Sequence, residues 1–335
     1  MPDLIDAWTH IFPSAYFARL QTMASAAGPL RRWMELKSLY DLDHRFRLMD
    51  AFPGYSQLLT PSMPPIEDLA DGETATDMMR LMNDGLADLV SRYPDRFPAF
   101  AGALSLHDVD AALAEVGRAD GMGAAGFQLC THMRGVPLDD PRFAPVFDEI
   151  ARRKLAIWLH PVRGPLPDYP TETKSRYEIW WCFGWPYDSS VAMSRLVFSG
   201  LFDRHPDLKV ITHHMGAMIP YFAGRITQGW GLEMGSRTPP ADANLLPGPL
   251  LRPVEEYFRM FIADTALSGA VGATRCGLDY FGADNVVFAS DFPFDAEGGS
   301  YLVRETIKAL DALELSDGVR RRIDKDNISK IIFRK

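Results

Sequence analysis

The chain has 335 residues, 47% of them hydrophobic, and a formal net charge of −9. This length exceeds that of a usual single domain but fits one large α/β barrel, which we expect to span residues 1–335. The acidic balance argues against binding to nucleic acid or an anionic membrane, since both favour a basic surface.

Short apolar segments alternate with amphipathic helices from one end of the chain to the other. The expected strands cover residues 3–8, 54–60, 97–104, 123–130, 154–160, 207–214, 259–266 and 285–291. Apolar residues recur every three or four positions between them, as in 76–93 and 110–119, which predicts helices. Eight strands separated by helices favour a parallel (β/α)8 barrel of the TIM type. An open doubly wound sheet is the alternative, because periodicity does not reveal closure.

Two stretches interrupt this alternation. Residues 13–40 follow the first expected strand, and residues 161–190, rich in Pro, Trp and Tyr, follow the fifth. A barrel of this kind carries its active-site loops at the carboxyl ends of its strands. We therefore expect both stretches to be lids or walls of a site within a single domain.

Polar residues stand where four of the expected strands end. His10 follows the first strand, His160 closes the fifth, His213 and His214 close the sixth, and Asp291 closes the eighth. One such His is often only hydrogen-bonded, and an Asp after a strand often caps the next helix. The whole set instead predicts a site for a divalent metal, because imidazoles with one carboxylate suit a cation of borderline-soft character.

The first residues carry acids where a secretory signal would carry basic residues. No segment reaches the roughly 20 apolar residues that cross a bilayer. The three cysteines form no CxxC pair and are too few for a disulfide framework. These features favour a cytoplasmic protein that binds neither membranes nor nucleic acid.

The chain resembles the amidohydrolase superfamily, in particular the branch of aminocarboxymuconate-semialdehyde decarboxylase and related aromatic acid decarboxylases. The resemblance rests on "IDAWTHIFP" at 5–13, "HP" at 160–161, "GWPYDSSVAMSRLVFSGLFDRHPDLKVITHHMGAMIPYFAGRI" at 184–226 and "FGADNVVFASDFPF" at 281–294. It covers nearly the whole length, and the block at 184–226 is its most specific part.

The resemblance implies a divalent metal, commonly zinc, held by a pair on strand one, a His on strand five and an Asp on strand eight. The matching positions are Trp8 with His10, then His160, then Asp291. The strand-six His of the family, followed here by "MGA", corresponds to His214 and implies a role in proton transfer.

Trp8 departs from the pattern, because an indole cannot bind a metal. His10, His160 and Asp291 still suffice for a catalytic zinc, or for manganese, since such a metal needs three protein ligands and an open position. A metal-free protein is the alternative. Trp8 itself either fills the volume of the missing ligand or stacks against a flat substrate.

The resemblance also implies substrate-binding residues. Arg225 matches a position that reaches a neighbouring subunit's site and contacts a substrate carboxylate, which a bidentate guanidinium suits. That role requires a homodimer or larger homo-oligomer; a surface Arg is the alternative. The aromatic residues Trp180, Trp181 and Trp185 would wall the pocket, and Arg163, just after "HPV", is a further anion-binding candidate.

The function that these residues favour is non-oxidative decarboxylation of a small aromatic or unsaturated carboxylic acid. The metal would stabilise developing negative charge, and His214 or Asp291 would move the proton that replaces CO2. The same residues can serve a hydrolase acting on a lactone, an amide or a carbon–carbon bond, or a hydratase. A binding protein without metal or turnover is the remaining alternative.

Overall fold

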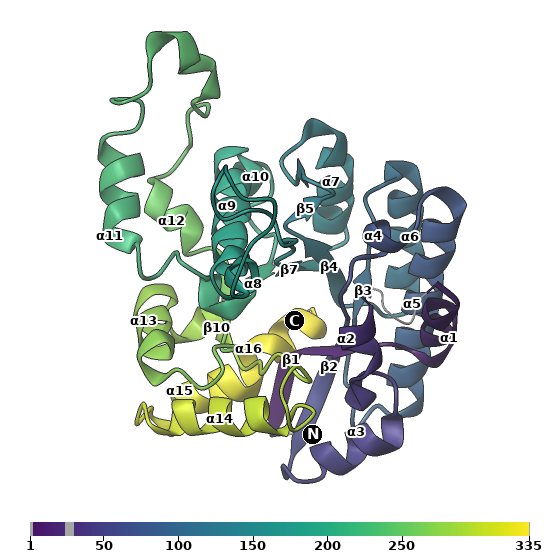
Figure 1. Ribbon diagram of the computed structural model, residues 1–335. Coiled ribbons are helices and arrows are strands. Elements are labelled where there is room, and N and C mark those ends of the chain that lie inside the picture. Colours follow the sequence, from purple (N-terminus) through teal and green to yellow (C-terminus); the bar gives the residue numbers. More distant parts are fainter. Residues whose placement is uncertain (1–2, 24–29, 335) are drawn as a thin grey trace.

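A computed structural model describes residues 3–23 and 30–334 (Figure 1). Eight parallel strands alternate with helices, as the sequence predicts. They are β1 (Leu4–Ile11), β2 (Tyr55–Pro61), β3 (Ala101–Ala103), β4 (Gly126–Cys130), β7 (Ala156–His160), β8 (Val210–Thr212), β9 (Ile262–Asp264) and β10 (Val286–Val287). A short antiparallel hairpin, β5 (His132–Met133) and β6 (Val136–Pro137), lies between β4 and β7.

The strands close into a barrel. Six of them pair in the order β10-β9-β8-β7-β4-β3, and β1 pairs with β2. Parallel bridges join the two groups at Leu59 with Phe100 and at Thr9 with Phe292. The His10 N–H also donates to the Phe292 carbonyl over 2.8 Å. The prediction of a (β/α)8 barrel is therefore confirmed, and the open sheet is excluded.

Helices surround the barrel (Figure 1). The predicted helices at 76–93 and 110–119 correspond to α5 and α6. The α-helices are α1 (Ser14–Met23), α2 (Arg31–Met34), α3 (Leu42–Met49), α4 (Ile66–Leu69), α5 (Gly72–Arg92), α6 (Val109–Gly121), α7 (Ala144–Arg152), α8 (Ile179–Cys182), α9 (Gly184–Phe198), α10 (Leu201–Arg204), α11 (Ala223–Ile226), α12 (Val254–Phe258), α13 (Val271–Phe281), α14 (Ser300–Asp311), α15 (Asp317–Arg321) and α16 (Asn327–Ile332). Shorter 3-10 and π turns are η1 (Lys37–Leu39), η2 (Pro141–Phe143), η3 (His214–Gly216), η4 (Thr227–Leu232), η5 (Pro240–Leu245), η6 (Ala283–Asn285) and η7 (Arg322–Asp326).

Two tryptophans fill the inside of the barrel. Trp8 and Trp158 are both fully buried, and the Trp158 Nε1–H donates to the Ala7 carbonyl over 2.9 Å. Small residues make room for these rings. At Gly126 a Cβ would lie 2.0 Å from the Ala156 carbonyl oxygen, so this position requires glycine. The small residues of the inner cluster that contains both rings are Ala7, Ala99, Ala101, Ala125, Ala156, Ala266 and Ala289.

The two stretches expected to be lids or walls contain some helix. Residues 13–40 include α1, α2 and η1, while 24–29 lie outside the described residues. Residues 161–178 form no helix or strand, and α8 and the start of α9 follow them. Their role at the site stays a prediction.

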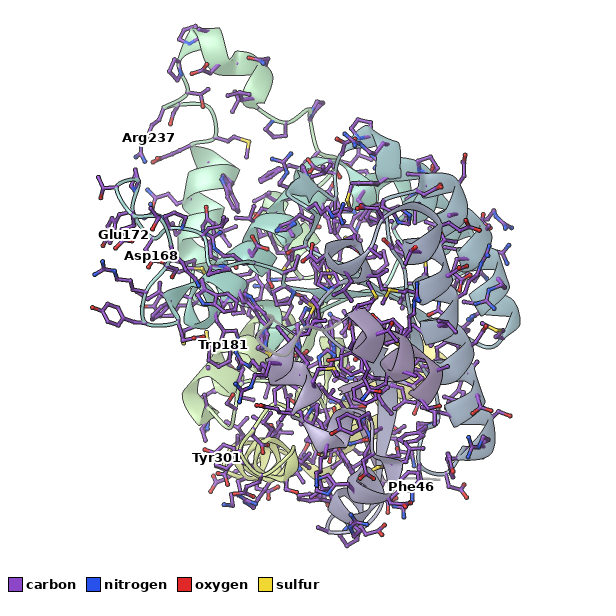
Figure 2. All side chains as sticks on the ribbon, turned by 45° about the vertical axis from the view of Figure 1, so that its right-hand side comes forward. Phe46, Asp168, Glu172, Trp181, Arg237 and Tyr301 are labelled. Carbon is purple, nitrogen blue, oxygen red and sulfur yellow. The ribbon has the colours of Figure 1, made fainter. Side chains whose placement is uncertain are left out.

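The sequence did not predict the projecting segment, residues 227–253. It leaves α11, stands away from the barrel and returns through α12 (Figure 1). Figure 2 shows Arg237 at its edge, where the side chain points outward. Its exposed apolar side chains include Leu232, Leu245 and Leu251. Across the described part of the chain, no helix is long and apolar enough to span a membrane.

Candidate metal centre

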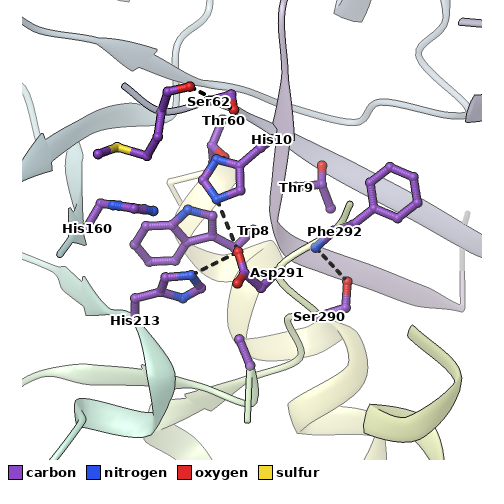
Figure 3. A network of polar contacts seen from close by, with 12 residues as sticks. Trp8, Thr9, His10, Thr60, Ser62, His160, His213, Ser290, Asp291 and Phe292 are labelled. Carbon is purple, nitrogen blue, oxygen red and sulfur yellow. Dashed lines mark hydrogen bonds and ion pairs between the residues drawn. The ribbon is translucent and has the colours of Figure 1, made fainter. Parts of the chain in front are cut away.

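The polar residues at the strand ends meet at one place, as predicted (Figure 3). His10 lies in β1, His160 ends β7, His213 follows β8, and Asp291 follows β10. The Asp291 Oδ1 atom is 3.3 Å from the Nε2 atoms of both His10 and His213. The other carboxylate oxygen, Oδ2, is 3.8 Å from the Nε2 atom of His214. Four strands far apart in sequence thus supply one cluster.

The cluster is buried on the side of His10, His160 and His213 and partly exposed on the side of His214 and Asp291. His10 and His213 are fully buried, and His160 is nearly so. The side chains of His214 and Asp291 are 20% and 22% exposed, respectively. A ligand therefore reaches the cluster from the side of His214 and Asp291.

The backbone of three residues at the cluster adopts the left-handed region. The φ angles are 56° for His214, 55° for Met215 and 67° for Asp291. This region is uncommon outside glycine and costs about 1–3 kcal/mol for each residue. Such strain persists where the surrounding structure dictates it, and it often marks a functional site. Here it affects two of the residues predicted to be catalytic.

Trp8 lies in an irregularity of β1. Between paired positions the chain advances three residues in β1, from Asp6 to Thr9, while β2 advances only two, from Gln57 to Leu59. This extra residue is a β-bulge, which changes the direction of the local side chains. The Trp8 ring is stacked on the ring of His213, with centroids 4.1 Å apart and planes at 18°. One face of the indole is therefore occupied by protein.

His213 belongs to the predicted set of strand-end residues, but the sequence alone assigned it no role of its own. The resemblance pointed to His214, the neighbour that precedes "MGA". Side chains alternate between the two faces of a strand. Ile211 belongs to the inner cluster of the barrel, whereas Val210 packs against the outer helices. Alternation from Ile211 therefore directs His213 inward, but the structure was needed to show which of the two faces is the inside.

Each of the three buried imidazoles has the same nitrogen engaged. Nδ1 donates to the Pro61 carbonyl in His10 (2.7 Å), to the Pro161 carbonyl in His160 (2.6 Å), and to the Asp264 carboxylate in His213. Because carbonyl and carboxylate oxygens only accept, Nδ1 carries the proton, and the neutral ring then has its lone pair on Nε2.

The lone pairs lack a positive partner. Apart from Asp291, the Nε2 atoms of His10 and His213 have no polar partner among the described residues. Two nitrogen lone pairs thus face one carboxylate oxygen. Such groups repel one another unless a proton or a cation lies between them. One ligand atom from each of His10, His160 and His213 also lies within 4.8 Å of the others. The residues therefore fit a divalent metal ion.

Burial and charge set the protonation states of the cluster. Burial alone would lower the pKa of His213, but the carboxylates of Asp264 and Asp291 raise it to about 10, so this ring carries a proton between the two carboxylates that a bound metal would replace. Burial lowers the pKa of His160 well below its ordinary value, and the neighbouring rings of His10 and His213 lower it further. Burial alone would raise the pKa of Asp291, but the imidazoles of His10 and His213 beside its carboxylate hold that pKa well below its ordinary value. Neutral imidazole and ionised carboxylate are the forms that bind metals.

The predicted aromatic and cationic residues lie at different distances from the cluster. The Trp185 ring packs edge-on against His160, with centroids 5.6 Å apart, and its Nε1–H donates to the Arg163 carbonyl. Trp181 is 39% exposed and packs under the guanidinium of Arg32 instead. The Arg163 guanidinium lies 6.0 Å from the centre of the Tyr187 ring. Of this group, Trp185 contacts the cluster.

Arg225 lies elsewhere. It is exposed on α11 and lines a groove of about 1080 Å³ between α9 and the projecting segment. Within the described residues it makes no contact with the cluster. Its predicted role in a neighbouring subunit's site stays a prediction.

Comparison with known proteins places these features in context. The sequence matches the amidohydrolase family over residues 5–334. It is 31% identical to a gamma-resorcylate decarboxylase of Rhizobium radiobacter, over 92% of this chain and 96% of that protein. The fold matches a crystal structure of 2,6-dihydroxybenzoate decarboxylase complexed with 2,6-dihydroxybenzoate, at a TM-score of 0.77, 26% identity and 99% coverage of both chains. It also matches a dihydroxybenzoic acid decarboxylase from Polaromonas sp. JS666 with bound manganese and the inhibitor 2-nitroresorcinol, at a TM-score of 0.78 and 25% identity, covering 99% of this chain and 97% of that one.

Proposed function

Since the chain belongs to the amidohydrolase family, we propose that it is a metal-dependent, non-oxidative decarboxylase of aromatic carboxylic acids. One observation carries this proposal. A cluster of imidazoles and a carboxylate that fits a metal stands at the strand ends of a chain that is similar over 92% of its length to a decarboxylase. The relatives' substrates point to hydroxylated benzoic acids as the first class to test.

His10, His160 and Asp291 are the residues proposed to hold the metal. When bound, a divalent metal stabilises negative charge that develops on the carboxylate or on an adjacent oxygen of the substrate. Imidazole nitrogens bind zinc more tightly than manganese. We therefore expect zinc in protein purified without added metal, although a related structure contains manganese.

His214 is proposed to deliver the proton. Decarboxylation breaks the bond between the ring carbon and the carboxylate, leaves the electron pair on that carbon and releases CO2. A proton must then reach the same carbon. Asp291 is engaged with His10 and His213, whereas His214 is 3.8 Å from the carboxylate and partly exposed at the opening. Burial lowers the pKa of His214 and the neighbouring His213 lowers it further, so its protonated ring is a stronger acid that readily gives a proton to a bound substrate ring.

Trp185 and Arg225 are proposed to bind the substrate. Trp185 contacts His160 and offers an aromatic wall beside the cluster. Arg225 is exposed on α11, so it can serve the site of a second copy, and we propose that the active protein is at least a dimer. Trp8 is fully buried with one face on His213, which supports the role of filling the volume of the missing ligand.

The deciding experiment measures CO2 release from a panel of hydroxybenzoates, with metal content determined on the same samples. We expect CO2 release that requires metal and that is lost in His160→Ala. A hydrolase would instead consume a lactone or amide and release no CO2. Protein that lacks metal, releases no CO2 and still binds an aromatic acid would be the binding protein named above, and the proposal would be wrong.

A further inference from the structure

His213 lies where a metal ligand would lie. Its side chain is fully buried, and its Nε2 atom faces Asp291 Oδ1 at 3.3 Å. Its ring centre is 5.4 Å from that of His160 and 6.4 Å from that of His10. His213, His10 and His160 together form the most deeply buried group of potential ligands in the described part of the chain.

A carboxylate holds the ring of His213 in its orientation. Asp264, the last residue of β9, accepts from His213 Nδ1. Asp264 is itself fully buried and accepts from the backbone N–H groups of Met215 (3.3 Å) and Ala266 (3.0 Å). A carboxylate behind an imidazole fixes the tautomer and strengthens the ring as a ligand, as in many zinc sites. This places the free lone pair of His213 on Nε2, toward the cluster.

Trp8 packs against the face of the same His213 ring. The two rings are stacked with centroids 4.1 Å apart. An indole has one N–H donor and no lone pair for a metal, so Trp8 cannot be a ligand. Its bulky ring instead limits the rotation of His213 and thereby keeps Nε2 directed at Asp291.

From this arrangement we propose that His213 binds the same metal ion as the three predicted ligands. The centre then has three imidazoles and one carboxylate, and Trp8 and Asp264 are positioning residues for His213. This proposal rests on the proposed metal-dependent function. It assigns His213 and His214, two adjacent and identical residues, to different tasks.

Two matched variants, His213→Ala and His214→Ala, test this assignment. Metal-depleted protein is titrated with zinc and separately with manganese in competition with a chelator. Loss of an orienting partner already weakens metal binding by about 10- to 100-fold, so loss of a ligand in His213→Ala should weaken it by at least about a hundredfold. His214→Ala should change it by less than about tenfold, and Asp264→Asn should fall between the two. Unchanged affinity in folded His213→Ala would overturn the proposal.

Spectroscopy of the unmodified protein tests the same point if His213→Ala does not fold. X-ray absorption at the zinc edge reports the number of coordinated imidazoles, which we expect to be three. A zinc site with two imidazoles would leave the proposed function standing and show that His213 is not a ligand. Protein that takes up no metal and releases no CO2 would instead overturn the proposed function.

Discussion

Asp6 should make the stability of the protein depend on pH. The residue lies in β1, two positions before Trp8, and is fully buried. Its Oδ2 atom accepts from the Tyr55 hydroxyl (2.6 Å) and from the Ser290 hydroxyl, and its Oδ1 atom accepts from the Ser290 N–H (3.1 Å) and the Trp8 N–H (3.2 Å). Burial raises the pKa of Asp6 from 3.8 to about 6, although these hydrogen bonds oppose the change.

The sign and size of the effect follow from this pKa. The folded protein binds the Asp6 proton more tightly than the unfolded chain does, so this contribution favours folding at low pH. It decreases as the pH rises through the folded-state pKa and is absent well above it. Raising the pKa from 3.8 to about 6 corresponds to about 3 kcal/mol in total. About 2 kcal/mol of it should be lost between pH 4.5 and 7.5.

The variant Asp6→Asn isolates this contribution. Its side chain is uncharged at every pH, keeps an oxygen for the two N–H donors, and has an amide that the Tyr55 and Ser290 hydroxyls can accept from. Urea unfolding of the metal-free proteins, followed by tryptophan fluorescence, gives both free energies of unfolding. The difference, wild type minus variant, should fall by about 2 kcal/mol from pH 4.5 to 7.5.

The comparison with the variant cancels the titration of all other groups. Asp77→Asn, which changes an exposed carboxylate on α5, is the matched control and should give a difference that varies little with pH. A difference for Asp6→Asn that stays constant, or that rises with pH, would refute the reasoning. The carboxylate would then be ionised in the folded protein as readily as in the unfolded chain.

Three further predictions concern the site. His214→Asn should reduce kcat by about 10²- to 10⁴-fold, because a proton donor is lost. The metal content should stay unchanged, because no ligand is lost. Steady-state kinetics and metal analysis test this, and a preserved kcat would contradict it. Removal of metal with a chelator should abolish CO2 release. Added zinc or manganese should restore it in the wild type but not in His160→Ala. Activity in fully metal-depleted protein would exclude the metal-dependent mechanism. Arg225→Ala should raise KM by about tenfold or more, as expected for loss of a charged contact worth about 1.5–3 kcal/mol. Tm should change little. A large drop in Tm with unchanged KM would make Arg225 a structural residue.

The strands were predictable because they are buried on both faces. Residues 154–160 and 285–291 are mostly apolar, and β7 and β10 lie within these two ranges. Closure was not predictable in the same way. It depends on the bridges of Leu59 with Phe100 and of Thr9 with Phe292, which join segments that no local pattern relates.

The site was predictable in part. The strand-end positions of His10, His160 and Asp291 were readable, because a barrel brings its strand ends together. The inward direction of His213 was not, because Val210 and Ile211 are both apolar and buried, so alternation does not show which face is the inside. The stacking of Trp8 was not, because it depends on a bulge, and a bulge is a property of the pairing between two strands.

The projecting segment lies beyond what sequence patterns reveal. Residues 227–253 are rich in Gly and Pro and show no strand or helix periodicity. The two ends of the segment are fixed by contacts between α11 and α12, which lie more than twenty-five residues apart in the sequence. Leu232 and Leu251 are exposed, so no periodic pattern of buried apolar residues marks this segment in the sequence.

The bulge in β1 has a consequence for how this site can change under mutation. Regular pairing with β2 stops at Asp6 and resumes at Thr9, so Trp8 belongs to neither of the two regular stretches. His10 is held separately, through its Nδ1 bond to Pro61 and its N–H bond to Phe292. A change at position 8 should therefore act first on His213, against which the indole is stacked, and leave the bonds of His10 in place. Variation at this one position offers a route to alter the selectivity of the centre while the rest of the strand stays intact.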